Sequence, residues 1–305
     1  MQNPTPGLSR SQWNLIFVIL AVTFASIFFR VLKWRQLEHT SLLFIGIPAI
    51  LAIIVAFAPK AKTVTGAIVK AITIALLISG IFLGEGFICI LMAAPLFYLV
   101  GVIVGAVMDA GRKSNKVTMS CLVLLGLLPL SFEGSHQKLS LPREESVVVE
   151  RIVSAPAAEV ERALAQSPRF NPTLPMYLRI GFPRPLEAHG EGLQPGSMRV
   201  IHFSGSEAGH SGDLVMKVGA YEPGFVRFDA AFDHSHIIHW LSWRSAEVRW
   251  ASVDAGQTRV EWRLNLRRRL DPAWYFRPWE RYAARLAAGY LITTNATPES
   301  VSTKP

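Results

Sequence analysis

Hydrophobic and polar positions change their pattern near Phe132. Before this residue, long apolar runs cover 13–32, 41–58, 67–108 and 117–132, and after it apolar residues alternate with charged ones. A helix that crosses a bilayer needs about 20 predominantly apolar residues, which is close to the length of most of these runs. The pattern therefore predicts an N-terminal membrane-spanning region followed by a water-soluble domain.

The run 67–108 is too long for a single span, because as one helix it would extend roughly 60 Å, about twice the hydrocarbon thickness. A Gly-Glu-Gly segment centred on Glu85 interrupts it, so we predict two helices joined by a tight turn. Gly101 and Gly105 give the second helix a small-residue face that suits close helix packing. Five spans are predicted, near 13–32, 41–58, 67–83, 87–108 and 117–132. Four spans are the alternative, because the last run is short and contains Pro129.

After Phe132 the pattern predicts an α+β domain. Strands are expected at 144–153, 197–203, 213–221, 225–232, 237–243, 246–253 and 258–268. A short helix that Ser154 can cap runs to about Gln166. The stretch 168–195 is rich in Pro and Gly and predicts no long element. A helix of about 20 residues, starting at Pro272, closes the domain.

Two segments and the closing helix resemble a known superfamily. Val153–Val160 (VSAPAAEV) follows the first strand, and Gly190–Gly196 (GEGLQPG) precedes the second. In this arrangement the chain resembles the START-like (SRPBCC, helix-grip) superfamily, in particular its polyketide cyclase/dehydrase and lipid-transport group, over roughly residues 144–297. The resemblance implies a curved antiparallel sheet that grips a long C-terminal helix around an apolar cavity for a lipid, a polyketide or another hydrophobic molecule. It does not supply a reaction, because one fold hosts many functions.

The expected fold class is thus a membrane α-helical bundle of about five spans followed by an α+β helix-grip domain with a curved antiparallel sheet and a long C-terminal helix. The boundaries are 1–132 for the transmembrane region, 133–143 for a linker, 144–297 for the helix-grip domain and 298–305 for a disordered tail. A fully extended linker of this length spans at most roughly 35 Å, which would keep the domain near the bilayer.

Charge follows the same division. Residues up to Phe132 hold 10 Lys and Arg against 3 Asp and Glu, and the remaining residues hold 21 against 19. The nearly balanced second part has no basic face for phosphates, so no nucleic-acid partner is expected. With five spans, loop cations favour a cytoplasmic N-terminus and a domain on the outer, periplasmic face of a bacterial inner membrane. Four spans would place the domain in the cytoplasm.

Aromatic residues of the domain are candidates to line the implied cavity. If the closing helix lies across the sheet, one stripe of that helix faces inward, opposite alternate strand residues. The candidate ligand-binding residues are Trp240, Trp250 and Trp262 of the strands and Trp274, Tyr282, Leu286 and Tyr290 of the helix. Aromatic rings with one polar edge suit an amphipathic ligand, although the same residues could form an ordinary core.

Candidates for chemistry gather in the segment 233–240, which reads DHSHIIHW. In an extended strand, His234 and His236 would project to one face, and Asp233 and His239 to the other. Two imidazoles on one face could relay a proton or contact a polar ligand group. Strand-end histidines without a function are the alternative interpretation.

A metal ion at these histidines would need a third ligand. Only the distant His202 and His210 could provide it. We therefore predict no metal and no other cofactor.

Three consecutive arginines, Arg267, Arg268 and Arg269, end the last predicted strand. A cation near an anionic leaflet contributes about 1 kcal/mol, so these side chains are candidates for contact with lipid headgroups. The alternative is a solvated strand end whose arginines pair with Asp271 or Glu261.

These features favour a membrane-anchored module that binds a hydrophobic ligand or lipid between the sheet and the terminal helix. A cyclase/dehydratase-like enzyme acting on a lipophilic substrate, and a ligand-free sensing or interaction domain, are the alternatives. Binding without catalysis is favoured because no nucleotide loop, catalytic triad spacing or strong metal motif is present. The expected partners are the bilayer and a hydrophobic small molecule or lipid, and the spans leave oligomerisation open.

Overall fold

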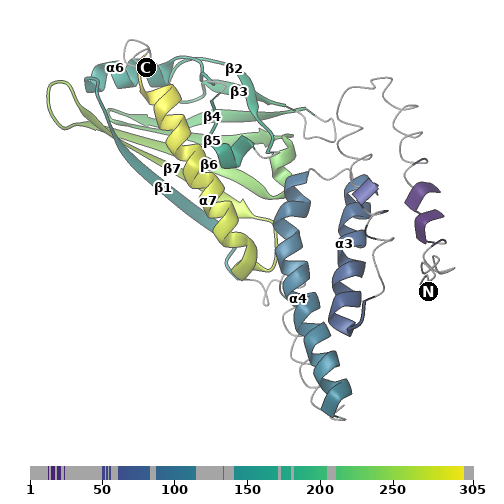
Figure 1. Ribbon diagram of the computed structural model, residues 1–305. Helices are drawn as coiled ribbons and strands as arrows, with labels where there is room; N and C mark the ends of the chain where they lie inside the picture. The colour runs from purple at the N-terminus through teal and green to yellow at the C-terminus, as the bar shows by residue number, and fades with distance from the viewer. Residues whose placement is uncertain are drawn as a thin grey trace. The chain divides into compact units, whose positions relative to one another are not determined.

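The computed structural model describes residues 61–82, 87–114, 141–170, 173–179, 182–204 and 211–298, with Glu133 and single positions within 13–24 and 50–55 (Figure 1). The chain forms two compact units, Met1–Pro129 and Leu130–Pro305. Their boundary lies close to the change in pattern at Phe132. Each unit is described by itself.

In the first unit, two helices pack against each other: α3 at Val64–Phe82 and α4 at Phe87–Ser114. The small-residue face of α4 is the contact surface. A Cβ atom added to Gly105 would lie 2.5 Å from the Cα atom of Thr65, and one added to Gly101 would lie 2.3 Å from the Ile72 side chain. Because the first of these neighbours is backbone, a larger residue at 105 would push the helices apart. The predicted packing role of the two glycines is confirmed.

The Asp109 carboxylate of α4 also links the two helices, at the start of α3. Asp109 of α4 accepts hydrogen bonds from the backbone N–H groups of Val64, at 2.8 Å, and Thr65, at 3.0 Å. The Thr65 hydroxyl donates to the same carboxylate at 2.7 Å. The first N–H groups of a helix have no partner within the helix, so Asp109 caps α3 from the neighbouring helix.

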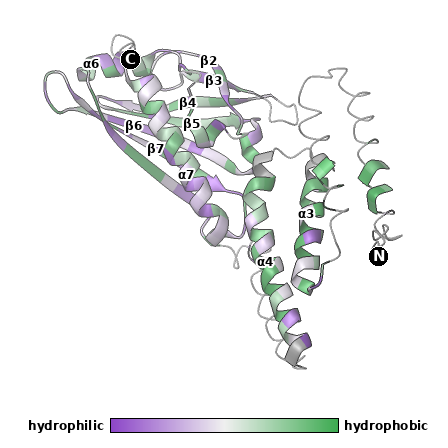
Figure 2. Cartoon of the chain, viewed as in Figure 1, coloured by the Kyte–Doolittle hydropathy of each residue, from purple (hydrophilic) through white to green (hydrophobic). Residues whose placement is uncertain are grey.

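Helices are found where the third and fourth spans were predicted. One stretch of the described residues, Ile90–Arg112, is long and apolar enough to cross a membrane, and Val64–Ser79 is apolar but shorter. Figure 2 shows that hydrophobic residues dominate both helices. The first, second and fifth predicted spans lie mostly outside the described residues, as do the turn at Glu85, most of the predicted linker and nearly all of the predicted tail. Five spans are therefore not established.

The second unit is built on a seven-stranded antiparallel sheet with the order β1-β7-β6-β5-β4-β3-β2. The strands are β1 Glu144–Val153, β2 Pro185–His189, β3 Met198–Phe203, β4 Gly212–Glu222, β5 Phe225–Asp233, β6 Leu241–Ser252 and β7 Thr258–Arg268. The first strand pairs with the last, so β1 and β2 form the two edges. Register shifts lie within β4 and β6, and bulges of this kind bend and twist a sheet.

Helical elements accompany the sheet. The bounds are α6 Ala157–Ala165, η4 Met176–Arg179, η5 His236–His239, α7 Ala273–Leu291 and η6 Ile292–Ala296. The long helix α7 lies across one face of the sheet (Figure 1) and contacts β1 and β7. The predicted antiparallel sheet with a long C-terminal helix is confirmed.

Three local predictions were wrong. The strand expected at 237–243 begins only at Leu241, and the 3-10 helix η5 takes its first residues. The edge strand β2 lies within the Pro-rich stretch, where no strand was predicted. Pro156 occupies the N-cap position of α6 without a side-chain hydrogen bond, so Ser154 is not the cap.

The glycine-rich segment before β3 closes the end of α6. The Gly192 N–H donates to the Ala165 carbonyl at 2.7 Å, and the Arg199 guanidinium of β3 donates to the Leu164 carbonyl. Gly190 has φ 111°, and a Cβ atom there would lie 2.0 Å from the Met198 carbonyl oxygen. Only glycine fits this position, which explains the first residue of the GEGLQPG segment.

Candidate functional site

The buried stripe of α7 differs from the predicted one. The residues that α7 buries are Ala273, Phe276, Glu280, Ala284, Ala288 and Gly289. Of the four helix candidates, Trp274 and Tyr282 are 48% and 50% exposed, and Leu286 and Tyr290 are half-buried. Both stripes repeat every four residues but are offset by two, which rotates one from the other by about 200° around the helix. The inward stripe escaped prediction because, apart from Phe276, it consists of small residues and one glutamate.

The three candidate tryptophans predicted on strands lie inside. Trp250 of β6 and Trp262 of β7 are each 5% exposed, and Trp240, which ends η5 just before β6, is 9% exposed. Trp250 and Trp262 belong to the main hydrophobic cluster, which reaches α6 and the end of α7. The indole N–H of Trp262 is buried without a hydrogen-bond partner, and so is that of Trp243, a half-buried β6 residue that was not predicted.

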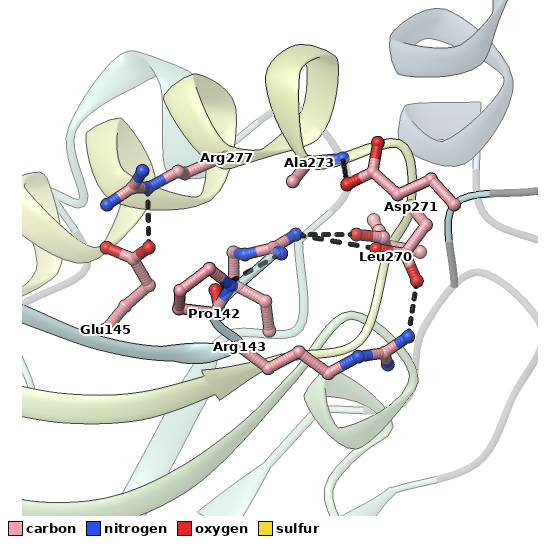
Figure 3. A network of polar contacts seen from close by, with 9 residues as sticks. Pro142, Arg143, Glu145, Leu270, Asp271, Ala273 and Arg277 are labelled. Atoms are coloured by element: carbon pink, nitrogen blue, oxygen red, sulfur yellow. Dashed lines mark hydrogen bonds and ion pairs between the residues drawn. The ribbon is translucent and has the colours of Figure 1, made fainter. Parts of the chain in front are cut away.

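A network of charged side chains lies where β1 begins, β7 ends and α7 starts (Figure 3). At its centre is Arg268, whose side chain has no exposed surface. Its guanidinium donates to the Leu270 carbonyl at 2.9 Å and to the Pro142 carbonyl at 3.4 Å. It also lies 3.9 Å from the Asp271 carboxylate, which forms a second ion pair with Arg143. Arg268 thus joins the strand before α7 to the chain entering β1.

A second ion-pair group binds β1 to α7. The Glu145 side chain is only 3% exposed and forms ion pairs with Arg277 and, at 3.0 Å, with Arg281. Figure 3 shows Arg277 reaching from the helix down to Glu145 on the strand. The two arginines are one helical turn apart, so both can reach the same carboxylate.

Glu280 is the unusual member of this region. It is 4% exposed, and the backbone N–H of Leu270 acts as a hydrogen-bond donor to its carboxyl group. Burial raises its pKa from 4.5 to about 7, although the Arg268 charge and the Leu270 N–H act in the opposite direction. The nearby carboxylates Glu145 and Asp271 raise the pKa further. A buried carboxyl group with this pKa can be neutral or charged near pH 7.

The predicted role of the three arginines in lipid contact requires a correction. Arg268 is fully buried and held by backbone carbonyls, so it cannot reach a headgroup. Arg267 and Arg269 are exposed, since β7 alternates its side chains between two faces. Arg267 lies 3.9 Å from the Glu144 carboxylate, and Arg269 donates to the Ile238 carbonyl at 3.2 Å. Of the three arginines, Arg268 forms the predicted ion pair with Asp271.

The histidine segment is folded differently from the strand that was expected. Asp233 accepts hydrogen bonds from the Ser235 N–H, at 2.9 Å, and from the Ser235 hydroxyl, at 2.6 Å, and this turn leads into η5. His236 therefore pairs with His239, with ring centroids 4.6 Å apart, and His234 packs against Phe232. The expected pair of His234 and His236 on one face is wrong. Within the described residues, no three His, Cys, Asp or Glu side chains gather to hold a metal ion.

A chain of aromatic rings runs from the end of η5 to α7. Trp240 contacts Phe182 edge-on at 5.4 Å, Phe182 contacts Tyr177 at 5.3 Å, and Tyr177 contacts Tyr282 of α7 at 5.1 Å between ring centroids. Burial, followed by the neighbouring Tyr282 and Tyr275, raises the pKa of Tyr177 to about 12. The Pro-rich stretch thus contributes η4 to this side of the domain. The hydrophobic periodicity of the sequence did not predict the contact between Tyr177 and Tyr282.

On its outer side, α7 borders an open groove of about 490 Å³. Arg277, Pro278, Arg281, Tyr282 and Arg285 line it. Tyr282, predicted to face a cavity beneath the helix, lies in this groove instead. The buried charged residues of the region where β1, β7 and α7 meet are Glu145, Arg268 and Glu280. Glu145 and Glu280 were not predicted as site residues, and Arg268 was assigned to the surface. A glutamate on the inward stripe gives no sequence signal, because acids normally mark the solvent face of a helix.

The strand order, the short helix between the first two strands and the long terminal helix across the sheet define a helix-grip fold. No protein-family model matches the sequence, and no curated protein matches it. Among solved structures, the Zhui aromatase/cyclase from Streptomyces sp. R1128 is 18% identical and is covered over 90% of its chain and 50% of this one, with a TM-score of 0.33. Norcoclaurine synthase from Thalictrum flavum is 13% identical, covered over 84% of its chain and 48% of this one, with a TM-score of 0.33. With values this low, the fold class rests on the topology itself.

Proposed function

We propose that the second unit binds a hydrophobic ligand between its sheet and α7. One observation carries the proposal: the indole N–H groups of Trp262 on β7 and Trp243 on β6 are buried without hydrogen-bond partners. A buried polar group without a partner costs about 1–3 kcal/mol, and such groups are rare in folded proteins. A ligand that brings its own polar atoms into the interior would satisfy them.

The surroundings of these groups define the rest of the ligand. The interior around them is aliphatic and aromatic, and it includes Val147, Val248, Trp250 and Leu266. Small-molecule sites are mostly apolar, with a few polar groups that fix orientation. The ligand is therefore largely apolar and carries few polar atoms.

Membrane attachment through the first unit is the second part of the proposal. Large apolar side chains on α4 are exposed in the structure, among them Leu91, Phe97, Leu99 and Val102. Contiguous apolar surface of this kind is unfavourable in water and is normally covered by a partner or by lipid. A lipid environment would cover it, and it would also hold the ligand-binding unit near a source of hydrophobic molecules.

The proposed topology places the second unit on the outer face of a bacterial inner membrane. Loop cations support this orientation if the first 132 residues form five spans. We expect an alkaline phosphatase fused after residue 298 to be active and a green fluorescent protein at the same point to be dark. A bright fluorescent fusion with inactive phosphatase would show that the unit lies in the cytoplasm.

Co-purifying ligand provides the test of binding. We expect mass spectrometry of the full chain, extracted in detergent, to recover a reproducible hydrophobic molecule. Trp262→Phe keeps an aromatic side chain but removes the N–H donor, so the bound molecule should fall about tenfold, in line with one lost hydrogen bond. Trp274→Phe, at an exposed position, is the matched control and should retain it. If the wild-type chain carries no such molecule, the binding proposal is wrong.

Glu280 also favours a second candidate function, an enzyme of the cyclase/dehydratase kind. A buried carboxyl group with a pKa of about 7 is suited to general acid or base catalysis near neutral pH. The histidines of 233–240 do not pair as predicted, so Glu280 is the stronger acid-base candidate. Conversion of the recovered molecule by wild type but not by Glu280→Gln, with binding retained, would favour the enzyme.

A further inference from the structure

The outer face of α7 carries a row of arginines. Arg277, Arg281 and Arg285 follow one another at intervals of four residues, so they lie about one helical turn apart and span about 12 Å along the helix axis. All three line the open groove of about 490 Å³ on this side of the helix. The single acidic residue of α7, Glu280, is buried on the inward stripe. The exposed surface of the helix therefore carries positive charge alone.

Most of this charge is not neutralised within the second unit. Arg277 and Arg281 share one carboxylate, that of Glu145 on β1. Arg285 forms no ion pair or hydrogen bond with any of the described residues. No carboxylate is among the described residues that line the groove. Three guanidinium groups therefore face one carboxylate, which leaves the outer face of α7 clearly positive.

Exposed aromatic rings lie beside the arginines. Trp274 is 48% exposed and Tyr282 is 50% exposed. On an ideal helix these two residues fall within the same arc of about 100° as Arg281 and Arg285, so rings and cations share one face. Tryptophan and tyrosine rings favour the headgroup layer of a bilayer, where the apolar ring and its polar edge both find suitable surroundings. An arginine can lay its apolar stem along the same layer while its guanidinium group stays among polar groups.

We propose that the outer face of α7 binds the surface of a membrane that contains anionic phospholipids. The inference rests on the membrane attachment proposed above and is independent of ligand binding inside the second unit. The arginines bind the phosphates of lipid headgroups, since a guanidinium group donates two parallel hydrogen bonds to a phosphate. Trp274 and Tyr282 lie in the headgroup layer beside them. The second unit is then held to the bilayer by this face as well as by the chain that joins it to the first unit.

An anionic bilayer fits this face better than a soluble phosphate does. The groove is open and its arginines are spread over about 12 Å, so a single phosphate could not contact all three of them. A layer of headgroups presents many phosphates at once. The half-exposed rings of Trp274 and Tyr282 would gain no apolar contact from a free phosphate, whereas the boundary between headgroups and acyl chains provides it.

The test uses the full chain in lipid nanodiscs. One set of nanodiscs contains phosphatidylcholine alone, and the other also contains phosphatidylglycerol, which is anionic. An environment-sensitive fluorophore is attached through Pro278→Cys, in a chain that also carries Cys89→Ala and Cys121→Ala, because residue 278 is exposed and lines the groove. We expect phosphatidylglycerol to shift the emission to shorter wavelength, as the label leaves water. High salt should reverse the shift, since it screens the charges.

Arg285→Gln is the decisive variant, because this side chain has no partner among the described residues whose loss could affect folding. One cation near an anionic leaflet strengthens binding by about fivefold, so the ratio of bound to unbound label should fall by that factor. Arg285→Lys, which keeps the charge, should retain most of the shift. Arg259→Gln, at an arginine of β7 that is 59% exposed, is the matched control and should behave as the wild type. Far-UV circular dichroism identifies a variant that does not fold.

Three results would overturn the inference while membrane attachment stands. Equal emission in both nanodiscs would show that the outer face of α7 does not bind an anionic bilayer, and would leave it to a soluble acidic partner. The same shift on adding glycerol 3-phosphate to phosphatidylcholine nanodiscs would show that α7 binds a free phosphate. An undiminished shift in Arg285→Gln would place the contact outside the arginine row. A chain that does not enter nanodiscs at all would instead show that membrane attachment is wrong, and the inference with it.

Discussion

Replacing Arg268 with methionine is expected to lower the unfolding free energy of the second unit by roughly 3–5 kcal/mol, the range measured when one partner of a buried ion pair is removed. Methionine fills a similar volume but donates no hydrogen bond. The carbonyls of Leu270 and Pro142 would each lose a donor, and the buried carboxyl groups of Asp271 and Glu280 would lose a nearby positive charge. The connection between the start of β1 and the end of β7 would loosen.

The neighbouring arginines provide an unusually close control. Arg267→Met and Arg269→Met change the same residue type one position away, on the exposed face of β7. Exposed substitutions of this kind cost less than about 0.5 kcal/mol. Urea unfolding of the full chain in detergent, followed by tryptophan fluorescence, measures all three. Equal losses at the three positions would show that Arg268 has no special structural role.

Glu280→Gln is expected to remove a pH-dependent loss of stability. The folded chain raises the pKa of this carboxyl group from 4.5 to about 7, so folding favours the protonated form. The contribution of this preference to the unfolding free energy is fully present below about pH 4.5 and is lost progressively as the pH rises through about 7. The loss is on the order of 3 kcal/mol, since one pKa unit corresponds to about 1.4 kcal/mol.

Thermal unfolding between about pH 4 and pH 8.5 tests this expectation. The variant and the wild type should have similar melting temperatures near pH 4, and the variant should be more stable above about pH 7. The charged groups around Glu280 are Glu145 on β1, Arg268 on β7 and Asp271 in the connection to α7, and they are unchanged in the variant. Glu150→Gln, an exposed carboxylate paired with Arg259 at 2.9 Å, should follow the wild-type profile. Parallel profiles for wild type and Glu280→Gln would contradict a raised pKa.

The sequence predicted most of the sheet because strand alternation and turn residues are local signals. β1 and β7 have the predicted bounds, and the turns at Gly224 and Gly256 join the hairpins that were expected. The failure at 237–243 has a local cause as well. The hydrogen bonds from Ser235 to Asp233 turn the chain there, and an alternating His-x-His pattern does not reveal them.

The candidate site was less predictable, because burial of charge depends on tertiary structure. Hydrophobicity predicted that the stripe of Trp274 and Tyr282 on α7 faces the sheet. The residues that α7 buries are instead Phe276, Glu280 and several small residues. Small side chains let a helix approach a sheet closely, and nothing in their sequence distinguishes this from a weakly hydrophobic surface. Side chains alternate between the two faces of a strand, so Arg268 lies on the opposite face from Arg267 and Arg269. The sequence alone does not show which of these faces is buried.

The three consecutive arginines, Arg267, Arg268 and Arg269, do not specify the register in which β7 pairs with its neighbours. A shift of β7 by one residue against β1 and β6 would still bring an arginine, either Arg267 or Arg269, to the position that Arg268 occupies. The charged end of the strand therefore cannot select the correct register. The same shift would turn Trp262, Leu264 and Leu266 outward, because a one-residue slip moves every side chain to the other face. The native register is therefore specified by this apolar row and not by the charged end of the strand.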